Sequence, residues 1–155
     1  SGPVRIAGGE AAHDRRMAEH LIEHGGVGYI QIDCGRIGGL GPARRVADFA
    51  ASRGVTYVNH TFTSNLALSA SMQPFAGLGT HRICEYPTGL QPLARELTLE
   101  RIAPDANGEI HLPDAPGLGV TVDPEALSRY AVDVRIEVGG RTVYPPAGAR
   151  GENSD

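Results

Sequence analysis

Tryptophan is absent from this 155-residue sequence, and aromatic residues make up only 5% of it. A platform of aromatic side chains on which nucleic-acid bases could stack is therefore not indicated. The formal net charge of −4 and the pI of about 5.8 argue in the same direction, because nucleic acids favour a basic surface. There are only two cysteines, Cys34 and Cys84, and they form no Cys-x-x-Cys motif. We expect no disulfide framework and a reduced, cytoplasmic setting.

Long apolar runs are also missing. None approaches the roughly 20 residues that a membrane-spanning helix needs, so we expect no membrane partner. The first residues, Ser-Gly-Pro-Val-Arg, lack the basic and then apolar pattern of a secretory signal. What the sequence does have is 21 glycines and 11 prolines, which lie at segment ends and are typical of turns. With 41% hydrophobic and 21% charged residues, the composition indicates a soluble globular protein.

Strand and helix patterns alternate over the first 87 residues. Strand patterns cover residues 4–7, 27–32, 55–59 and 82–84, and helical patterns cover 11–24, 43–52 and 66–75. On the first helix we expect Met17 and Leu21, with Ala18 and Ile22 as further candidates, to share the buried side. We expect Pro42 at the first position of the second helix, and Ser64 or Asn65 to cap the third. Such alternation predicts an α/β fold with a parallel sheet, either open and doubly wound or closed into a barrel.

The character of the sequence changes after Pro87. Residues 99–112 are irregular, residues 124–130 form a short helical pattern, and residues 132–143 predict a hairpin turning at Gly139-Gly140. We expect residues 145–155 to be disordered.

Four polar residues occupy equivalent places in the expected strand pattern. Glu10, Asp33, His60 and Glu85 each follow a strand, at steps of 23, 27 and 25 residues, which is about one strand–helix unit each. In a closed parallel barrel such residues converge at the mouth where active sites of that fold lie. Asn59 and Thr61, on either side of His60, are candidates to line the same mouth.

Other features have less specific interpretations. Gly38-Gly39-Leu40-Gly41 precedes a helix, but it has neither the spacing of a dinucleotide-binding turn nor that of a P-loop. His20 and His24 have zinc-ligand spacing without a third ligand nearby, which favours a solvated helix face. Cys34 is either a nucleophile near His60 or a small buried residue, and burial is the simpler interpretation. Arg36 could contact a substrate carboxylate or simply be solvated.

Several stretches resemble one known family. They are Ile-Ala-Gly-Gly-Glu ending at Glu10, Ile-Asp-Cys-Gly-Arg-Ile-Gly-Gly around Asp33, Asn-His-Thr-Phe around His60, Ile-Cys-Glu-Tyr-Pro around Glu85, and Pro-Gly-Leu-Gly-Val at residues 116–120. In this order and spacing they resemble the mandelate racemase group of the enolase superfamily. The resemblance implies the C-terminal half of a (β/α)8 barrel for residues 1–98. It also implies a tail, residues 99–155, that packs back toward a capping domain.

The resemblance implies a role for each strand-end residue. Glu10 matches a carboxylate ligand of an essential Mg²⁺, a hard cation that prefers oxygen ligands. His60 matches the general acid/base, and Asp33 matches the partner that orients its ring. Glu85 matches an acid that hydrogen-bonds the enolate oxygen, for which it must carry its proton. Members of the superfamily with lysine at the position of Asp33 form other groups, so the Asp33/His60 pair favours racemases and acid-sugar dehydratases.

The implied chemistry is Mg²⁺-dependent removal of the proton α to a carboxylate, through an enediolate. We expect a lyase that dehydrates an aldonate or aldarate in acid-sugar catabolism. A racemase or epimerase of a 2-hydroxy acid using the same residues is the alternative. The capping domain, the other metal carboxylates and the Lys-x-Lys motif of complete members are not found in the 155 residues. We therefore expect the isolated chain to be inactive, either as a half-barrel fragment or as a partner subunit, and the complete protein to be a homo-oligomer.

Overall fold

The computed structural model describes residues 4–61, 64–76, 78–79 and 83–144. Phe62, Arg82 and the expected disordered segment 145–155 lie outside these residues. The chain divides into two compact units, residues 1–123 and 124–155. The assignment of residues 1–98 to a half barrel and 99–155 to a packing tail stays a prediction. No helix in the described part of the chain is long and apolar enough to cross a membrane.

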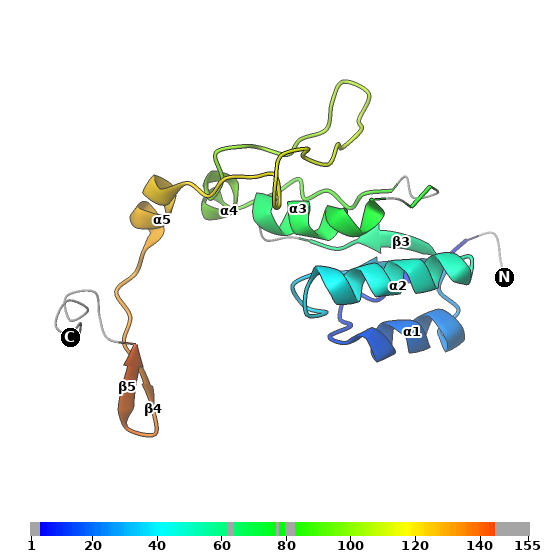
Figure 1. Ribbon diagram of the computed structural model, residues 1–155, viewed down its shortest axis with the longest axis horizontal. Helices are drawn as coiled ribbons and strands as arrows, with labels where there is room; N and C mark the ends of the chain where they lie inside the picture. The colour runs from blue at the N-terminus through cyan, green and yellow to red at the C-terminus, as the bar shows by residue number, and fades with distance from the viewer. Residues whose placement is uncertain (1–3, 62–63, 77, 80–82, 145–155) are drawn as a thin grey trace. The chain divides into compact units, whose positions relative to one another are not determined.

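The first unit contains a three-stranded parallel sheet in the order β1-β2-β3. The strands are β1 (Ala7–Gly8), β2 (Tyr29–Ile32) and β3 (Thr56–Asn59). Helices α1 (Arg15–His24) and α2 (Leu40–Ser52) make the two crossovers, as parallel neighbours require, and lie side by side in Figure 1. Helix α3 (Asn65–Met72), continued by the 3₁₀ turn η1 (Gln73–Phe75), follows β3 and packs on α2. The expected alternation of parallel strands and helices is confirmed.

Helix α1 begins later than the apolar pattern suggested. Asp14 caps it, since its side chain accepts a hydrogen bond of 2.9 Å from the Met17 amide, and residues 11–14 are not helical. Ala18 and Ile22 are its buried residues, whereas Met17 is 43% exposed and Leu21 only partly buried. The expected centre of the buried side was therefore wrong by one position, which is about 100° around a helix.

The caps and the start of the other helices are visible in the structure. Ser64 caps α3 through a 3.2 Å hydrogen bond from the Ala67 amide, as one of the two expected candidates. Helix α2 starts at Leu40, so Pro42 is its third residue and not its first. A short helix that the sequence did not predict, α4 (Pro92–Glu96), begins at a proline, which favours first helical positions.

The expected fourth strand is not formed by the described residues 83–87. The backbone of Glu85 is bonded to a side chain instead of to a strand. Its amide donates to Asn59 Oδ1 at 2.9 Å, and its carbonyl accepts from Asn59 Nδ2 at 3.0 Å. The Asn59 amide thus takes the place of a strand ladder and fixes Glu85 beside the end of β3.

The main core lies between the sheet and its helices. Its fully buried members include Ala18, Ile30, Ile32, Ala43, Val46, Ala47, Ala50 and Tyr57. A second, smaller cluster of Leu68, Met72 and Ile102 lies under α3. Burying these side chains gives the free energy that holds the strands, and hence the strand ends, in place.

The second unit consists of helix α5 (Pro124–Tyr130) and a two-stranded antiparallel sheet. The sheet pairs β4 (Ile136–Val138) with β5 (Arg141–Tyr144) around Gly139-Gly140. The helix over residues 124–130 is confirmed, and so is a hairpin that turns at Gly139-Gly140, but its first strand begins at Ile136 and not at Val132.

Candidate functional site

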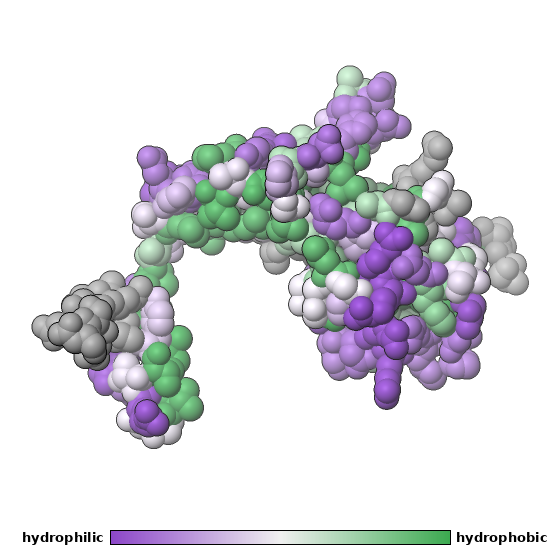
Figure 2. All heavy atoms as spheres, in the orientation of Figure 1, coloured by the Kyte–Doolittle hydropathy of each residue, from purple (hydrophilic) through white to green (hydrophobic). Residues whose placement is uncertain are grey.

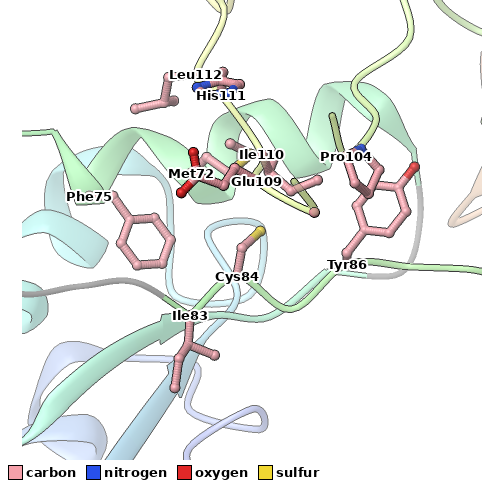
Figure 3. A pocket seen from close by; sticks show the side chains of 11 residues that line it. Met72, Phe75, Ile83, Cys84, Tyr86, Pro104, Glu109, Ile110, His111 and Leu112 are labelled. Atoms are coloured by element: carbon pink, nitrogen blue, oxygen red, sulfur yellow. The ribbon is translucent and has the colours of Figure 1, made fainter. Parts of the chain in front are cut away.

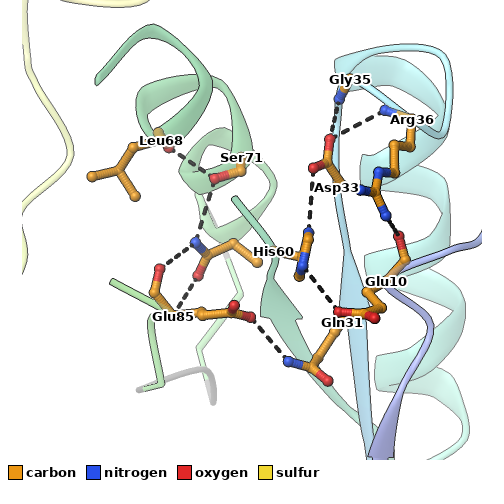
Figure 4. A network of polar contacts seen from close by, with 10 residues as sticks. Glu10, Gln31, Asp33, Gly35, Arg36, His60, Leu68, Ser71 and Glu85 are labelled. Atoms are coloured by element: carbon orange, nitrogen blue, oxygen red, sulfur yellow. Dashed lines mark hydrogen bonds and ion pairs between the residues drawn. The ribbon is translucent and has the colours of Figure 1, made fainter. Parts of the chain in front are cut away.

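His60 is the centre of the candidate site (Figure 4). It follows β3, and its amide donates to the Ile32 carbonyl at 2.9 Å, which continues the parallel ladder beyond the strand. Its Nδ1 lies 3.3 Å from Asp33 Oδ2, and its Nε2 lies 3.1 Å from Glu10 Oε2. Its side chain is only 3% exposed, whereas the Glu10 side chain is 61% exposed. The imidazole thus joins two carboxylates, one toward the interior and one toward solvent.

Asp33 is held rigidly by the turn that follows β2. Its Oδ1 accepts from the Gly35 amide at 2.8 Å and from the Arg36 amide at 3.1 Å, which leaves Oδ2 directed at His60. This arrangement fixes the ring of His60 by one nitrogen. A tautomer with its proton on Nδ1 donates to Asp33 and leaves Nε2 as the basic atom.

Arg36 connects the ends of β1 and β2. Its guanidinium donates a 3.2 Å hydrogen bond to the backbone carbonyl of Glu10. The side chain is exposed, but this bond gives it a structural role beyond solvation. A positive charge consequently lies next to the segment that carries the Glu10 carboxylate.

Glu85 faces the same edge of the sheet from the other side of His60. Gln31 Nε2 donates to Glu85 Oε2 at 2.9 Å, so one carboxyl oxygen is held and the other is left for a second interaction. The sequence did not predict a role for Gln31, and the prediction that Asn59 lines the mouth was wrong. Gln31 is a polar residue within an otherwise apolar strand, and such a residue could have indicated a side chain that points into a site. Asn59 is fully buried beneath Glu85 instead of lining the mouth.

The Asp33/His60 pair lines a cleft of about 490 Å³ together with residues of α3 and the start of α2. The larger cleft, of about 620 Å³, contains none of the four candidate residues (Figure 3). It lies along α3, and its walls are mostly apolar side chains such as Met72, Phe75 and Ile110. We assign the site to the smaller cleft because the acid/base groups are there.

The other candidate groups have structural explanations. His20 and His24 are exposed and their rings lie 4.7 Å apart at a tilt, as expected of a solvated helix face. Among the described residues, a close trio of possible metal ligands occurs at Asp105, Glu109 and His111, all exposed. Bonds from the Glu109 amide and from His111 lower the pKa of Asp105, so this carboxylate already serves to close its own loop.

Cys34 is a buried free thiol, in agreement with the simpler interpretation of the sequence. Burial, and next the negative charge of Asp33, raise its pKa from 9.0 to about 11, so it is neutral near pH 7. Its Sγ donates to the Ala70 carbonyl at 3.4 Å. Burial likewise raises the pKa of Tyr57 well above its usual value.

The raised pKa of Cys34 predicts that the protein loses stability at alkaline pH. The folded protein holds the Cys34 proton more tightly than the unfolded chain, so the stabilisation is complete below pH 9 and is lost as the pH rises to about 11. The loss attributable to this thiol is about 2–3 kcal/mol. Urea unfolding measured across that range should show the decline, and Cys34→Ala should make it shallower. The same slope in Cys34→Ala would contradict the assignment.

Gly9 sets the position of Glu10. Its φ is +116°, and an added Cβ would lie 2.6 Å from Ile30 Cδ1 and 2.9 Å from the Gln31 carbonyl oxygen. Gly39 is a matched position, because its φ is +111° but an added Cβ would meet nothing within 4 Å. Both residues therefore have a backbone conformation that other residues rarely adopt. Only at Gly9 is there also no room for a side chain.

We predict that Gly39→Ala costs about 1–2 kcal/mol of unfolding free energy, from backbone strain alone. Gly9→Ala should cost about 1–3 kcal/mol more, because the methyl group overpacks the contact with Ile30. Chemical denaturation of the two variants side by side tests the difference. Equal losses would mean that β1 does not approach β2 as described.

Comparisons with known proteins point to one family. A family model described as enolase C-terminal domain-like matches residues 1–126. The crystal structure of a predicted mandelate racemase from Rhodobacter sphaeroides is similar with a TM-score of 0.87 and 62% sequence identity, and the match covers 93% of this chain and 37% of that chain.

Two curated enzymes are more distant. The D-galactarolactone cycloisomerase of Agrobacterium fabrum is 26% identical over 137 residues, 83% of this chain and 36% of that enzyme. The D-xylonate dehydratase of Haloferax volcanii is 29% identical over 128 residues, 83% of this chain and 31% of that enzyme. This chain therefore spans about a third of the length of these relatives.

Proposed function

This chain belongs to the enolase C-terminal domain-like family, and we propose that its strand-end residues remove the proton α to the carboxylate of a small substrate. The observation that carries the proposal is the placement of His60 between Asp33 and Glu10, at 3.3 Å and 3.1 Å. A histidine held by one nitrogen and directed by the other toward an exposed carboxylate is arranged for proton transfer.

Glu10 suits a hard divalent cation such as Mg²⁺. Its carboxylate is mostly exposed at the end of β1, and Mg²⁺ is commonly held by one or two carboxylates together with water and substrate oxygens. Bound there, the cation would supply positive charge that stabilises an enediolate. The remaining ligands would come from parts of the protein that correspond to the other two-thirds of the relatives' length.

In this proposal each residue has one task. His60 Nε2 accepts the α-proton, while Asp33 holds the ring and stabilises the resulting imidazolium. Glu85, with one oxygen fixed by Gln31, donates its proton in a hydrogen bond to the developing enediolate oxygen. The hydroxyl of the neighbouring carbon then takes this proton back from the His60 imidazolium and leaves as water, which gives an enol that becomes a 2-oxo-3-deoxy acid.

We favour dehydration of an acid sugar because one relative is a D-xylonate dehydratase and another acts on an acid-sugar lactone. Racemisation or epimerisation is the second candidate, and it is favoured by the 62% identity to the predicted mandelate racemase. Both reactions begin with the same proton transfer, so the site residues serve either one.

The test is proton exchange at the α-carbon. Because the chain corresponds to 37% of the Rhodobacter sphaeroides structure, a chimera with residues 1–144 in the matching place of that protein supplies a complete barrel. With Mg²⁺ in deuterated water, we expect deuterium at C2 of an accepted acid sugar together with a 2-oxo product. Deuterium without a 2-oxo product would indicate a racemase or epimerase. Neither signal over a panel of aldonates, aldarates and 2-hydroxy acids would overturn the proposal.

A further inference from the structure

Gln31 places an amide side chain inside the sheet layer of the molecule. It lies in β2, whose sequence is Tyr-Ile-Gln-Ile, and it is only partly exposed. Hydrophilic side chains gather instead on the outside of the helical layer, as Figure 2 shows over α1. An amide that has lost part of its contact with water costs free energy unless it has a hydrogen-bond partner. The partner of Gln31 is therefore informative about its role.

Gln31 lies on the same face of the sheet as the acid/base pair. It pairs with Val58 of β3, and continuing that register by two residues places Asp33 opposite His60. Side chains two residues apart on a strand share a face, so Gln31 lies one level below the pair. Figure 4 shows its amide directed toward Glu85.

The contact between Gln31 and Glu85 crosses the intervening strand. Gln31 Nε2 donates to Glu85 Oε2 at 2.9 Å, and β3 lies between β2 and the segment that carries Glu85. Because an amide nitrogen can only donate, Oε2 accepts, and a proton on this carboxyl group belongs on Oε1. In the described part of the chain, no other side chain is hydrogen-bonded to the Glu85 carboxyl group.

The backbone of Glu85 is held separately, by the Asn59 side chain at 2.9 Å and 3.0 Å. Asn59 is fully buried, and its Nδ2 also lies 3.4 Å from Ser71 Oγ of α3. With the backbone fixed, the freedom that remains to Glu85 is rotation about its side-chain bonds, which would let the carboxyl group take many orientations. The hydrogen bond from Gln31 removes that freedom.

We propose that Gln31 is a positioning residue for Glu85: its amide holds Oε2, so that Oε1 carries the proton and faces the substrate. This inference rests on the proposed function, in which Glu85 gives that proton to the developing enediolate in a hydrogen bond. Strand β2 then orients both reacting groups, since Asp33 sets the ring of His60 and Gln31, two residues earlier, sets the acid. Such support keeps reacting groups in a productive geometry.

Gln31→Met in the chimera tests this role. Methionine has a similar length and no hydrogen-bond donor, so Glu85 keeps its carboxyl group but loses its orientation. We expect kcat for α-proton exchange to fall about tenfold to a hundredfold, with KM unchanged within about twofold, because Glu85 acts on the transition state. Gln91→Met is the matched control. It makes the same change at an exposed glutamine whose side chain makes no capping bond, and it should leave both constants unchanged.

Two kinetic results would overturn the proposal. A raised KM with an unchanged kcat would mean that Gln31 contacts the substrate itself. An unchanged rate per folded molecule, with the folded fraction measured by urea unfolding, would mean that Gln31 only stabilises the fold.

An NMR spectrum of the 155-residue chain tests the contact without any reaction. The sequence has three glutamines, Gln31, Gln73 and Gln91, so labelling glutamine with ¹⁵N gives three side-chain amide signals, and Gln31→Met identifies one of them. Glu85→Ala should move the Gln31 signal and leave the other two in place. A Gln31 signal that stays in place would refute the contact. An inactive native chimera would instead refute the proposed function, and the Gln31 signal would still show whether the amide holds Glu85.

Discussion

Replacing His60 by asparagine is expected to reduce α-proton exchange in the chimera by at least about a thousandfold. Asparagine fills a similar volume and can still contact Asp33, but it has no basic nitrogen to accept the proton. The His60 ring is buried, and its Nδ1 is held by Asp33 at 3.3 Å. Exchange of the C2 proton for deuterium, followed by NMR, measures the loss directly and does not require elimination to occur.

His24→Asn is the matched control, since it makes the same chemical change at an exposed histidine of α1. It should leave exchange unchanged. Asp33→Asn should give an intermediate loss, of about a hundredfold, because the ring keeps its base but loses its orienting charge. Normal exchange in His60→Asn would refute the proposed role of His60, whereas normal exchange in Asp33→Asn would remove only the orienting role.

The convergence of Glu10, Asp33 and His60 could be predicted from the sequence because it follows from topology alone. Parallel strands end at one edge, so residues that follow successive strands become neighbours whatever their side chains are. The structure places the His60 ring within 3.3 Å of both carboxylates, with Nδ1 at 3.3 Å from Asp33 and Nε2 at 3.1 Å from Glu10. Their catalytic roles rest on the resemblance and stay predictions.

The support around Glu85 could not be predicted in this way. It depends on one buried amide, Asn59, that bonds to the backbone of a residue 26 positions away. A strand or helix pattern does not distinguish an asparagine that lines the mouth of the barrel from one whose side-chain amide takes the place of backbone hydrogen bonds between strands. The same limit applies to α1, where Met17, Ala18, Leu21 and Ile22 offer two adjacent apolar stripes. A cap at Asp14 and packing against α2 decided between them.

The largest effect on stability is expected from Ile30→Ala. Ile30 is fully buried at the middle of β2, where it pairs with Gly8 of β1 and Tyr57 of β3. Removing three of its carbons leaves a cavity between the sheet and its helices, and such changes cost about 2–5 kcal/mol. Ile6→Ala is the matched control. It makes the same chemical change at a side chain that is 59% exposed in this chain, so it should cost less than about 1 kcal/mol.

Urea denaturation of the 155-residue chain compares the two variants. The comparison also bears on the site, because Ile30 lies between Tyr29 and Gln31 and its side chain is next to Gly9. A loosened β2 would release both the residue that precedes Glu10 and the amide that holds Glu85. Similar losses in Ile30→Ala and Ile6→Ala would mean that the sheet does not form the core in the isolated chain. The geometry of the acid/base residues would then depend on the remainder of the barrel and not on this sheet.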